Sequence, residues 1–351
     1  MDKKVIAVVF GGKSSEHEVS KMSAATIMAA LDESKYFVMP IYISREGRWF
    51  FYDGPKDNIR NLAWEKFALP AILSPDAGHR GILRLVGDKF KLMHVDVIIP
   101  VLHGKNGEDG TMQGLFELSG IPYVGSGVLA SAVCMDKSFT NMMVDKMGIK
   151  RAPYKVFTKH DADADIDGVC RQIRYKLGYP CFVKPANAGS SVGISMANNK
   201  KELVECIQEA LKFDDKILVE KRVVGRELEC AVLGNDAPEA SGIGEIVFER
   251  DFYCYDAKYD CDASKTIVSA DLPSDVIEKI REISLKVYTA LGCKGLARVD
   301  FFYTEDGEVL FNEINTLPGF TAISMYPMLW KEQGVKIEEL VDKLIALALE
   351  G

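Results

Sequence analysis

Four polar residues on one predicted hairpin, at 296–315, have the types and spacing of a metal site: Arg298, Asp300, Glu313 and Asn315. The dipeptide 306–307, Asp-Gly, is typical of a two-residue type I′ turn between alternating strands. That turn would place Asp300 opposite Glu313. Facing carboxylates repel each other unless a cation lies between them, and hard oxygen ligands suit Mg²⁺. The alternative is a solvated hairpin edge on which Arg298 neutralises its neighbours.

The segment 181–194, CFVKPANAGSSVGI, could bind phosphate. Lys184 ends a predicted strand there, and the following loop holds glycines and serines whose backbone N–H groups could cradle phosphate oxygens. It is not a Walker A loop, because the G-x-x-x-x-G-K-[ST] order is missing. Farther on, Glu220 and Glu227 flank a turn and could accept hydrogen bonds from ribose. Taken alone, the first segment could be a flexible hairpin, and the two carboxylates are better explained as surface charges.

Glu16 and His103 lie in two polar segments, 10–20 and 102–110, that directly follow buried strands, where ligands of open α/β sheets bind. The purely structural alternatives are interaction of Glu16 with the helix dipole at a helix N-terminus and a backbone hydrogen bond from His103 in a turn. A G-x-G-x-x-G motif is absent, which disfavours a nicotinamide cofactor. The polar, aromatic-rich stretch 250–264 has no clear period and is typical of a lid, with Lys258 and Tyr259 as its chemical groups.

The elements that must position these residues change character along the chain. Apolar runs at 5–10, 37–43 and 95–102 alternate with helical patterns and predict a parallel sheet. The helix predicted over 15–31 is expected to begin with a Ser15/Glu18 capping box. We expect its buried stripe to consist of Val19, Met22, Ala25 and Ala29.

Later segments predict helices on mainly antiparallel sheets, so the fold class is α/β followed by α+β. The predicted division is an N-terminal α/β domain (1–125), a central unit (126–217) and a C-terminal unit (218–351) that contains the lid. For the hairpin at 296–315, the face opposite the metal site should carry Val299, Phe301, Tyr303, Leu310 and Ile314.

Composition limits the partners of this chain. It has 351 residues and a formal net charge of −8. This negative charge argues against a surface that binds nucleic acid or anionic membranes generally. Its 8 cysteines form no C-x-x-C pair and are typical of reduced thiols in a cytosolic protein. Apolar stretches such as 97–102 are far shorter than the roughly 20 residues of a membrane span. We therefore expect a cytoplasmic protein.

Seven separated motifs together resemble the D-alanine–D-alanine ligases of the ATP-grasp superfamily: GGKSSEHEVS, LHGKNGEDGTMQG, CMDK, FVKPANAGSSVG, FYCYDAKY, RVDFF and NEINTLPGFTAISMYP. The likeness runs almost from end to end. It implies a three-domain fold in which the central and C-terminal units clamp ATP. It also implies ligation of two D-alanines through a D-alanyl phosphate, for peptidoglycan precursor synthesis.

The resemblance assigns roles residue by residue. The implied ATP-binding residues are Lys137, Lys184, Ser191, Glu220, Lys221, Val223, Glu227 and Lys258. The implied ligands of two Mg²⁺ ions, for which Mn²⁺ could substitute, are Asp300, Glu313 and Asn315. The implied catalytic residues are the hydrogen-bonded triad Glu16, Ser190 and Tyr259, the oxyanion donors Arg298 and Gly319, and His103. The implied substrate-binding residues are Glu16, Lys258, Ser324 and Met325.

The resemblance also implies a homodimer. Two alternatives for the function remain open. The first is a relative that forms D-alanyl-D-serine, although an apolar Met325 suits a methyl group better than a hydroxyl. Tyr259 argues against a lactate-forming relative. The second is a catalytically silent nucleotide-binding protein, which would be expected to lose metal ligands or phosphate lysines, and none is missing from this chain.

Overall fold

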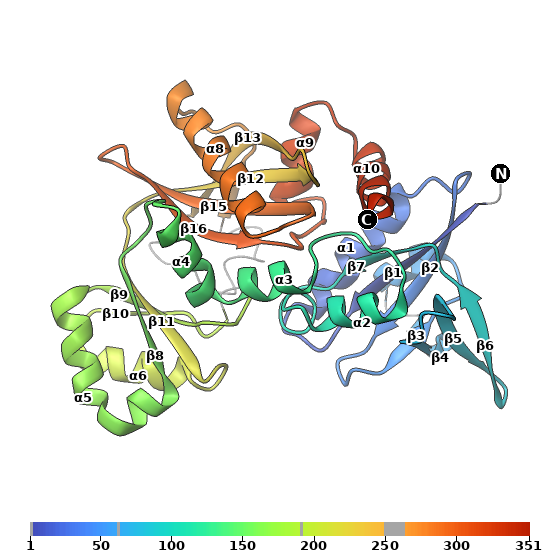
Figure 1. The fold of residues 1–351 in the computed structure, drawn as a ribbon, viewed down its shortest axis with the longest axis horizontal. Coiled ribbons are helices and arrows are strands. Elements are labelled where there is room, and N and C mark those ends of the chain that lie inside the picture. The colour runs from blue at the N-terminus through green and yellow to red at the C-terminus, as the bar shows by residue number, and fades with distance from the viewer. Residues whose placement is uncertain (1–2, 62–63, 190–191, 249–263) are drawn as a thin grey trace.

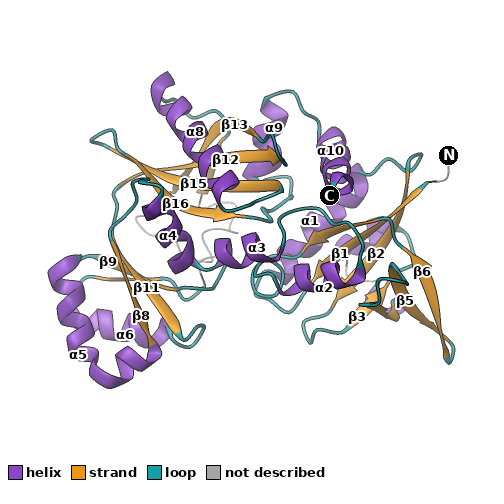
Figure 2. Cartoon of the chain, in the orientation of Figure 1, coloured by secondary structure: helices purple, strands orange, loops and turns teal. Residues whose placement is uncertain are grey.

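Residues 3–61, 64–189, 192–248 and 264–351 are described by the structure, a computed structural model (Figure 1). Three β-sheets form its framework, with helices packed on and between them (Figure 2). Among the described helices, none is long and apolar enough to cross a membrane.

The N-terminal sheet has seven strands in the order β6-β5-β4-β3-β2-β1-β7. They are β1 (Lys4–Gly11), β2 (Tyr36–Ile43), β3 (Trp49–Phe51), β4 (Leu69–Leu73), β5 (Gly81–Val86), β6 (Lys89–His94) and β7 (Val97–Val101). β1 pairs in parallel with β2 and β7, which confirms the expected parallel sheet. β3 to β6 extend this sheet with antiparallel pairs that the sequence did not predict.

Helices from both ends of the chain cover the N-terminal sheet. They are α1 (His17–Ala30), α2 (Thr111–Ser119) and the last helix, α10 (Ile337–Glu350), which packs on α1 and β7 (Figure 1). Apolar side chains of α10, such as Leu344, share a buried core with Phe10 and Met28. The C-terminal end of the chain therefore completes the core of the N-terminal domain.

The first helix begins without the predicted capping box. Glu16 occupies the N-cap position, and no side-chain hydrogen bond caps the helix. Glu18 instead pairs with Lys21 at 2.7 Å and with Arg45 at 2.8 Å. The capping-box prediction is wrong because the helix begins later than Ser15 and two cations attract the Glu18 carboxylate.

The buried face of α1 also differs from the predicted stripe. Met22 is 53% exposed and Ala29 is exposed, whereas Ser20, Ala24 and Met28 are buried. Serines can lie on the buried face because they hydrogen-bond to backbone there. The Ser20 hydroxyl donates to the carbonyl of Val101, and its oxygen accepts the Gly11 N–H at 2.7 Å. The prediction is confirmed for Ala25, which is 7% exposed, and wrong for Met22 and Ala29, because a pattern based on apolar residues alone misses the buried serines.

The central sheet has four strands in the order β10-β9-β11-β8. They are β8 (Tyr154–Thr158), β9 (Cys181–Pro185), β10 (Ser195–Ala197) and β11 (Lys216–Lys221). Helices α5 (Lys159–Lys176) and α6 (Lys200–Ala210) pack on this sheet, and α3 (Val128–Met135) and α4 (Lys137–Lys146) connect it to the N-terminal domain (Figure 1). The predicted boundary at 217 falls inside β11, and the division into 126–217 and 218–351 stays a prediction.

The C-terminal sheet has five antiparallel strands in the order β14-β13-β12-β15-β16. They are β12 (Gly225–Gly234), β13 (Glu239–Phe248), β14 (Ser264–Ile267), β15 (Gly295–Thr304) and β16 (Val309–Asn315), and helices α8 (Ser274–Ala290) and α9 (Met325–Glu332) pack on them. Antiparallel central and C-terminal sheets with packed helices confirm the α+β expectation.

The hairpin of β15 and β16 keeps the predicted pairing where the polar residues lie but not at its turn. Asp300 pairs with Glu313, and Arg298 with Asn315. The turn is a three-residue loop, 305–307, closed by the Gly307 N–H on the Thr304 carbonyl at 3.0 Å. The predicted two-residue turn is therefore wrong by one residue.

A bulge compensates for the longer turn. The register shifts by one between Asp300 and Phe301, which leaves Asn312 as the extra residue of β16. Between the turn and the bulge, Val309 and Phe311 point to the buried face and Leu310 does not. The prediction for Leu310 is therefore wrong. The four polar residues still share one face, because the bulge shifts the register back by the one residue that the longer turn adds.

Candidate active site

Asp300 and Arg298 form a buried ion pair at the centre of the site. The Arg298 Nε and Nη2 atoms donate to the two Asp300 carboxylate oxygens at 2.8 and 2.7 Å. The guanidinium also lies 3.1 Å from a carboxylate oxygen of Glu229 on β12. Burial alone would lower the pKa of Arg298, but Asp300 and Glu229 raise it well above its ordinary value. With Asp300 only 7% exposed, this hairpin face is not a solvated edge.

The facing residues provide a donor set that fits magnesium. Asn315 donates to Asp300 at 3.0 Å, so its amide oxygen is on the same face, and Glu313 lies directly across from Asp300. Within the described ranges, no three His, Cys, Asp or Glu side chains cluster as a complete metal site. This sparse set of oxygen donors matches magnesium, which completes its shell with substrate phosphates and water. The positive charges of Arg298 and Lys137 offset the two carboxylates in the metal-free protein.

Lys137 begins α4 and contacts the glycine-rich segment at two points. Its backbone N–H donates to the Ala186 carbonyl at 2.9 Å, and its Nζ donates to the Ala188 carbonyl at 2.8 Å. The same Nζ lies 3.6 Å from Glu313. Lys137 therefore stands between the predicted phosphate loop and the predicted metal ligands.

Asp136 fixes the start of α4. Its carboxylate accepts the backbone N–H groups of Ser138 and Phe139 and pairs with Lys216 of β11. Burial alone would raise the pKa of Asp136, but hydrogen bonds from Lys216 and Ser138 outweigh it and hold the pKa below its usual value.

We expect Asp136→Asn to lower the free energy of unfolding by about 2 kcal/mol at neutral pH, the range for hydrogen bonds to charged groups. Asparagine keeps the cap but loses the charge. A carboxylate with a lowered pKa stabilises the fold above its unfolded pKa and ceases to do so as pH falls below about 4. Urea unfolding near neutral pH and at about pH 3 should therefore show the difference between the two proteins shrinking in acid. A difference that does not change with pH would contradict this account.

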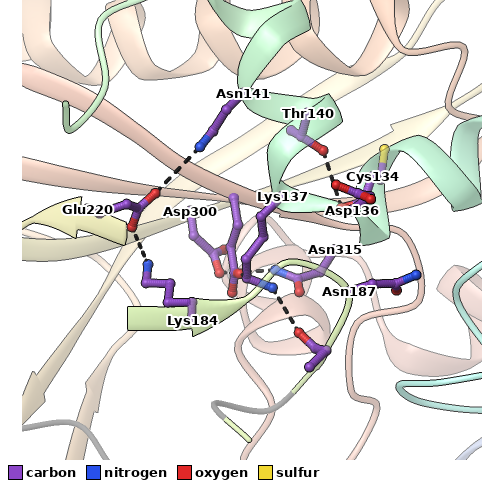
Figure 3. Close-up of polar contacts among 12 residues, drawn as sticks. Cys134, Asp136, Lys137, Thr140, Asn141, Lys184, Asn187, Glu220, Asp300 and Asn315 are labelled. Atoms are coloured by element: carbon purple, nitrogen blue, oxygen red, sulfur yellow. Dashed lines mark hydrogen bonds and ion pairs between the residues drawn. The ribbon is translucent and has the colours of Figure 1, made fainter. Parts of the chain in front are cut away.

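Lys184 of β9 and Glu220 of β11 form a second buried ion pair. Their Nζ and Oε2 atoms are 2.5 Å apart, and the Asn141 amide of α4 lies 3.5 Å from the other Glu220 oxygen (Figure 3). Burial alone would lower the pKa of Lys184, but Glu220 raises it, so the lysine stays charged. A buried cation at the end of β9, next to the glycine-rich segment, is suited to a phosphate group.

Glu16 is brought from the N-terminal domain to the glycine-rich segment. A Cβ atom built on Gly104 would lie 2.7 Å from its Oε2 atom, and one on Gly189 would lie 2.9 Å from the same atom. Gly189 also closely approaches the backbone of Gly104. These two glycines allow the N-terminal loop and the phosphate loop to meet around one carboxylate that is 8% exposed.

His103, Gly319 and Ser324 belong to two segments that contact each other, the loop after β7 and the segment after β16. The imidazole of His103 is 3.0 Å from the Leu317 carbonyl, two residues before Gly319. A Cβ atom on Gly319 would lie 2.8 Å from Ser324 Oγ, so these two residues are adjacent. The Ser324 oxygen accepts the Thr321 N–H at 3.0 Å. The segment after β16 thus approaches the His103 loop.

Met325 and its neighbour Tyr326 lie in the core, and the role of Met325 in substrate binding stays a prediction. Met325 is 4% exposed, and its sulfur would collide with a Cβ atom on Gly244, so the side chain packs on β13 in the core. The Tyr326 phenol donates to the Val232 carbonyl at 3.1 Å. Both side chains are buried, because the helix that begins here turns them inward.

The remaining predicted residues divide into two groups. Lys221, Val223 and Glu227 follow Glu220 along the connection from β11 into β12. Ser190, Ser191, Lys258, Tyr259 and nearly all of the expected lid lie outside the described residues. Their roles stay predictions.

Sequence reasoning missed the residues that support the site, among them Asp136, Lys216, Glu229 and Asn141. Asp136 had a readable signal, because an aspartate directly before a helical pattern is typical of an N-cap. The other three contact the site from neighbouring strands and helices, and no local motif marks them.

The antiparallel central sheet carries the buried Lys184, the C-terminal sheet carries the facing carboxylates Asp300 and Glu313, and Lys137 of α4 lies near Glu313. This arrangement is that of an ATP-grasp enzyme. Models of the D-ala D-ala ligase N-terminus and C-terminus match residues 5–126 and 143–346. The chain therefore belongs to the D-alanine–D-alanine ligase family.

Individual relatives agree with this assignment. A D-alanine–D-alanine ligase of Acetivibrio thermocellus is 50% identical, over 99% of this chain and 96% of the relative. One from Ruminiclostridium cellulolyticum is 49% identical, over 100% and 96%. Among solved structures, the VanG D-Ala:D-Ser ligase from Enterococcus faecalis has a TM-score of 0.90 at 40% identity, over 99% of this chain and 100% of that one. The D-alanine–D-alanine ligase from Coxiella burnetii has 0.86 at 36%, over 100% and 95%.

Proposed function

We propose that this protein joins two D-alanine molecules, with conversion of ATP to ADP and phosphate, to supply a peptidoglycan precursor in the cytoplasm. The observation that carries the proposal is the convergence of three parts on one site. Lys137 lies 3.6 Å from Glu313 of the β15–β16 hairpin, and Lys184 pairs with Glu220 beside the glycine-rich segment. Glu16 reaches that segment from the N-terminal domain. Membership of the family over the whole chain supports the same reaction.

The first step activates a poor electrophile. Glu16 would bind the ammonium group of the first D-alanine. A carboxylate oxygen of that D-alanine would form a bond to the γ-phosphorus of ATP. The bond from that phosphorus to the β–γ bridging oxygen breaks, and ADP leaves. Lys137 and Lys184 would bind the phosphates and offset their charge. Asp300, Glu313 and Asn315 would hold magnesium, which supplies further positive charge to the phosphates.

The second step forms the peptide bond. The amine of the second D-alanine attacks the acyl carbon, loses a proton, and inorganic phosphate leaves. Arg298 and the Gly319 N–H would stabilise the oxyanion, each by roughly 3 kcal/mol if they act as typical donors. Ser324, which adjoins Gly319, would help to bind the second carboxylate. Closure around the site matters because water would otherwise hydrolyse the acyl phosphate.

D-serine is the second candidate for the acceptor. The observation in its favour is the likeness to the VanG D-Ala:D-Ser ligase, at a TM-score of 0.90. Burial of Met325 removes the argument that its side chain selects a methyl group. We still propose D-alanine, since the relatives at 49–50% identity are D-alanine–D-alanine ligases.

The proposal is tested by ADP release with ATP, magnesium and a panel of amino acids. We expect turnover with D-alanine alone and none with L-alanine. At a fixed D-alanine donor concentration, D-serine should be a slower acceptor by about a hundredfold or less, because an added hydroxyl is weakly rejected. D-lactate should be inactive. A higher kcat/KM for D-serine would shift the assignment to the second candidate, and ATP binding without turnover would indicate a silent nucleotide-binding protein.

A homodimer and the absence of nucleic-acid and membrane partners belong to the same proposal. The acidic net charge of −8 supports the latter. Exposed apolar residues on the antiparallel part of the first sheet, including Ile72, Phe90 and Leu92, support contact with a second copy. The use of two magnesium ions, with manganese as a substitute, is proposed with the reaction.

A further inference from the structure

Residues of the N-terminal domain hold the backbone on both sides of Gly319. The Leu317 carbonyl accepts a hydrogen bond from His103 Nδ1 at 3.0 Å, and the Leu317 N–H donates to Glu108 at 3.3 Å. On the other side, the Phe320 N–H donates to Ser23 Oγ at 3.2 Å. The two residues between these anchors, Pro318 and Gly319, therefore have little freedom to move.

The anchors are connected to one another. The Nε2 atom of His103 lies 3.4 Å from Ser23 Oγ. With its proton on Nδ1, a neutral His103 donates to Leu317 and accepts the Ser23 hydroxyl, whose oxygen accepts the Phe320 N–H. Each member of this chain then has a consistent donor and acceptor role. Ser23 is fully buried and His103 is 5% exposed, so water does not compete for these bonds.

Glu108 connects this clamp to the loop that meets the phosphate segment. One of its carboxylate oxygens accepts the Leu317 N–H, and the other accepts the Gly104 N–H at 2.6 Å. Gly104 in turn adjoins Glu16 and Gly189. One side chain therefore sets the distance between the segment that carries Gly319 and the loop around Glu16.

We propose that Ser23 and Glu108 are positioning residues that hold the Gly319 N–H where the oxyanion forms; this inference rests on the proposed function. An oxyanion donor acts only over a narrow range of distances. It lowers the barrier because it is already in position before the reaction begins. Ser23 and Glu108 do not donate to the oxyanion themselves. They fix the backbone that does.

The test compares Ser23→Ala, Glu108→Gln and Glu108→Ala with wild type. Glutamine keeps one acceptor oxygen but turns an NH₂ group toward one of the two N–H donors, so its effect should lie between wild type and alanine. Ser119→Ala is the matched control, since Ser119 is equally buried and bonds backbone only within its own domain. We expect kcat to fall by about tenfold to a hundredfold in Ser23→Ala and Glu108→Ala, less than for outright loss of a donor. The KM values for ATP and D-alanine should stay near wild type.

A second readout separates positioning from packing. The affinity for a tetrahedral phosphinate analogue of the dipeptide should fall by the same factor as kcat/KM, because only the transition state uses the Gly319 donor. Melting temperatures should resemble that of Ser119→Ala. Unchanged kcat in the Ser23 and Glu108 variants would overturn the inference. So would lowered melting temperatures together with an affinity for the analogue equal to that of wild type. An inactive wild-type protein would instead overturn the proposed function, and the inference with it.

Discussion

Glu313→Gln is expected to abolish turnover while leaving the fold intact. Glu313 lies opposite Asp300 and 3.6 Å from Lys137, at the point where the hairpin meets the phosphate loop. Glutamine has nearly the same shape but no charge, so it cannot offset a cation. We expect kcat to fall by roughly a thousandfold or more, since metal-assisted charge stabilisation is worth several kcal/mol.

The measurements are ADP release across a magnesium titration and the melting temperature with and without magnesium and ADP. The variant should melt near wild type without ligands and should lose most of the stabilisation that they give together. Glu308→Gln is the control, because Glu308 lies on the same hairpin but pairs with Lys150 at its exposed end. Near-normal kcat for Glu313→Gln at saturating magnesium would contradict the metal assignment.

Lys184→Met should lower both stability and affinity for ATP. The lysine is the charged partner of Glu220 at 2.5 Å, and both side chains are largely buried. Removing one member of a buried ion pair leaves the other uncompensated, at a cost of about 3–5 kcal/mol. The affinity for ATP should fall by a hundredfold or more, about the loss of one strong charged contact to phosphate.

The double variant Lys184→Met/Glu220→Gln separates these two effects. Neutralising Glu220 removes the uncompensated charge, so urea unfolding should recover most of the lost stability. ATP affinity, measured by calorimetry, should not recover, since the cation remains absent. Lys200→Met is the control, because Lys200 pairs with Asp167 on the surface of the same unit. Recovery of ATP affinity in the double variant would show that Lys184 acts only through Glu220.

The local order of strands and helices around the site could be predicted from the sequence, and so could the ligand face of the hairpin. Apolar runs such as 5–10 and 37–43 predicted parallel strands because a strand buried on both faces has no polar alternation. Asp300 and Glu313 were paired correctly although the turn was not, since the bulge shifts the register back by the one residue that the longer turn adds.

Apart from the hairpin turn, the errors arise from tertiary contacts. Ser15 and Glu18 have the pattern of a capping box, yet Lys21 and Arg45 compete for the glutamate. The buried Ser20 of α1 is acceptable only because the ends of β1 and β7 offer it backbone partners. The same limit hid Glu108, whose partner Leu317 is 209 positions away in the chain. Such contacts carry no local signal.

The bulge at Asn312 has a consequence for how the family can change its sequence length. In a regular hairpin, adding or removing one residue reverses every side chain that follows. At a bulge, two neighbouring residues occupy the place of one, so the chain can lose Asn312 and still send Phe311 inward and Glu313 outward. Loss of this one residue would therefore leave the facing of the ligand end of the hairpin unchanged.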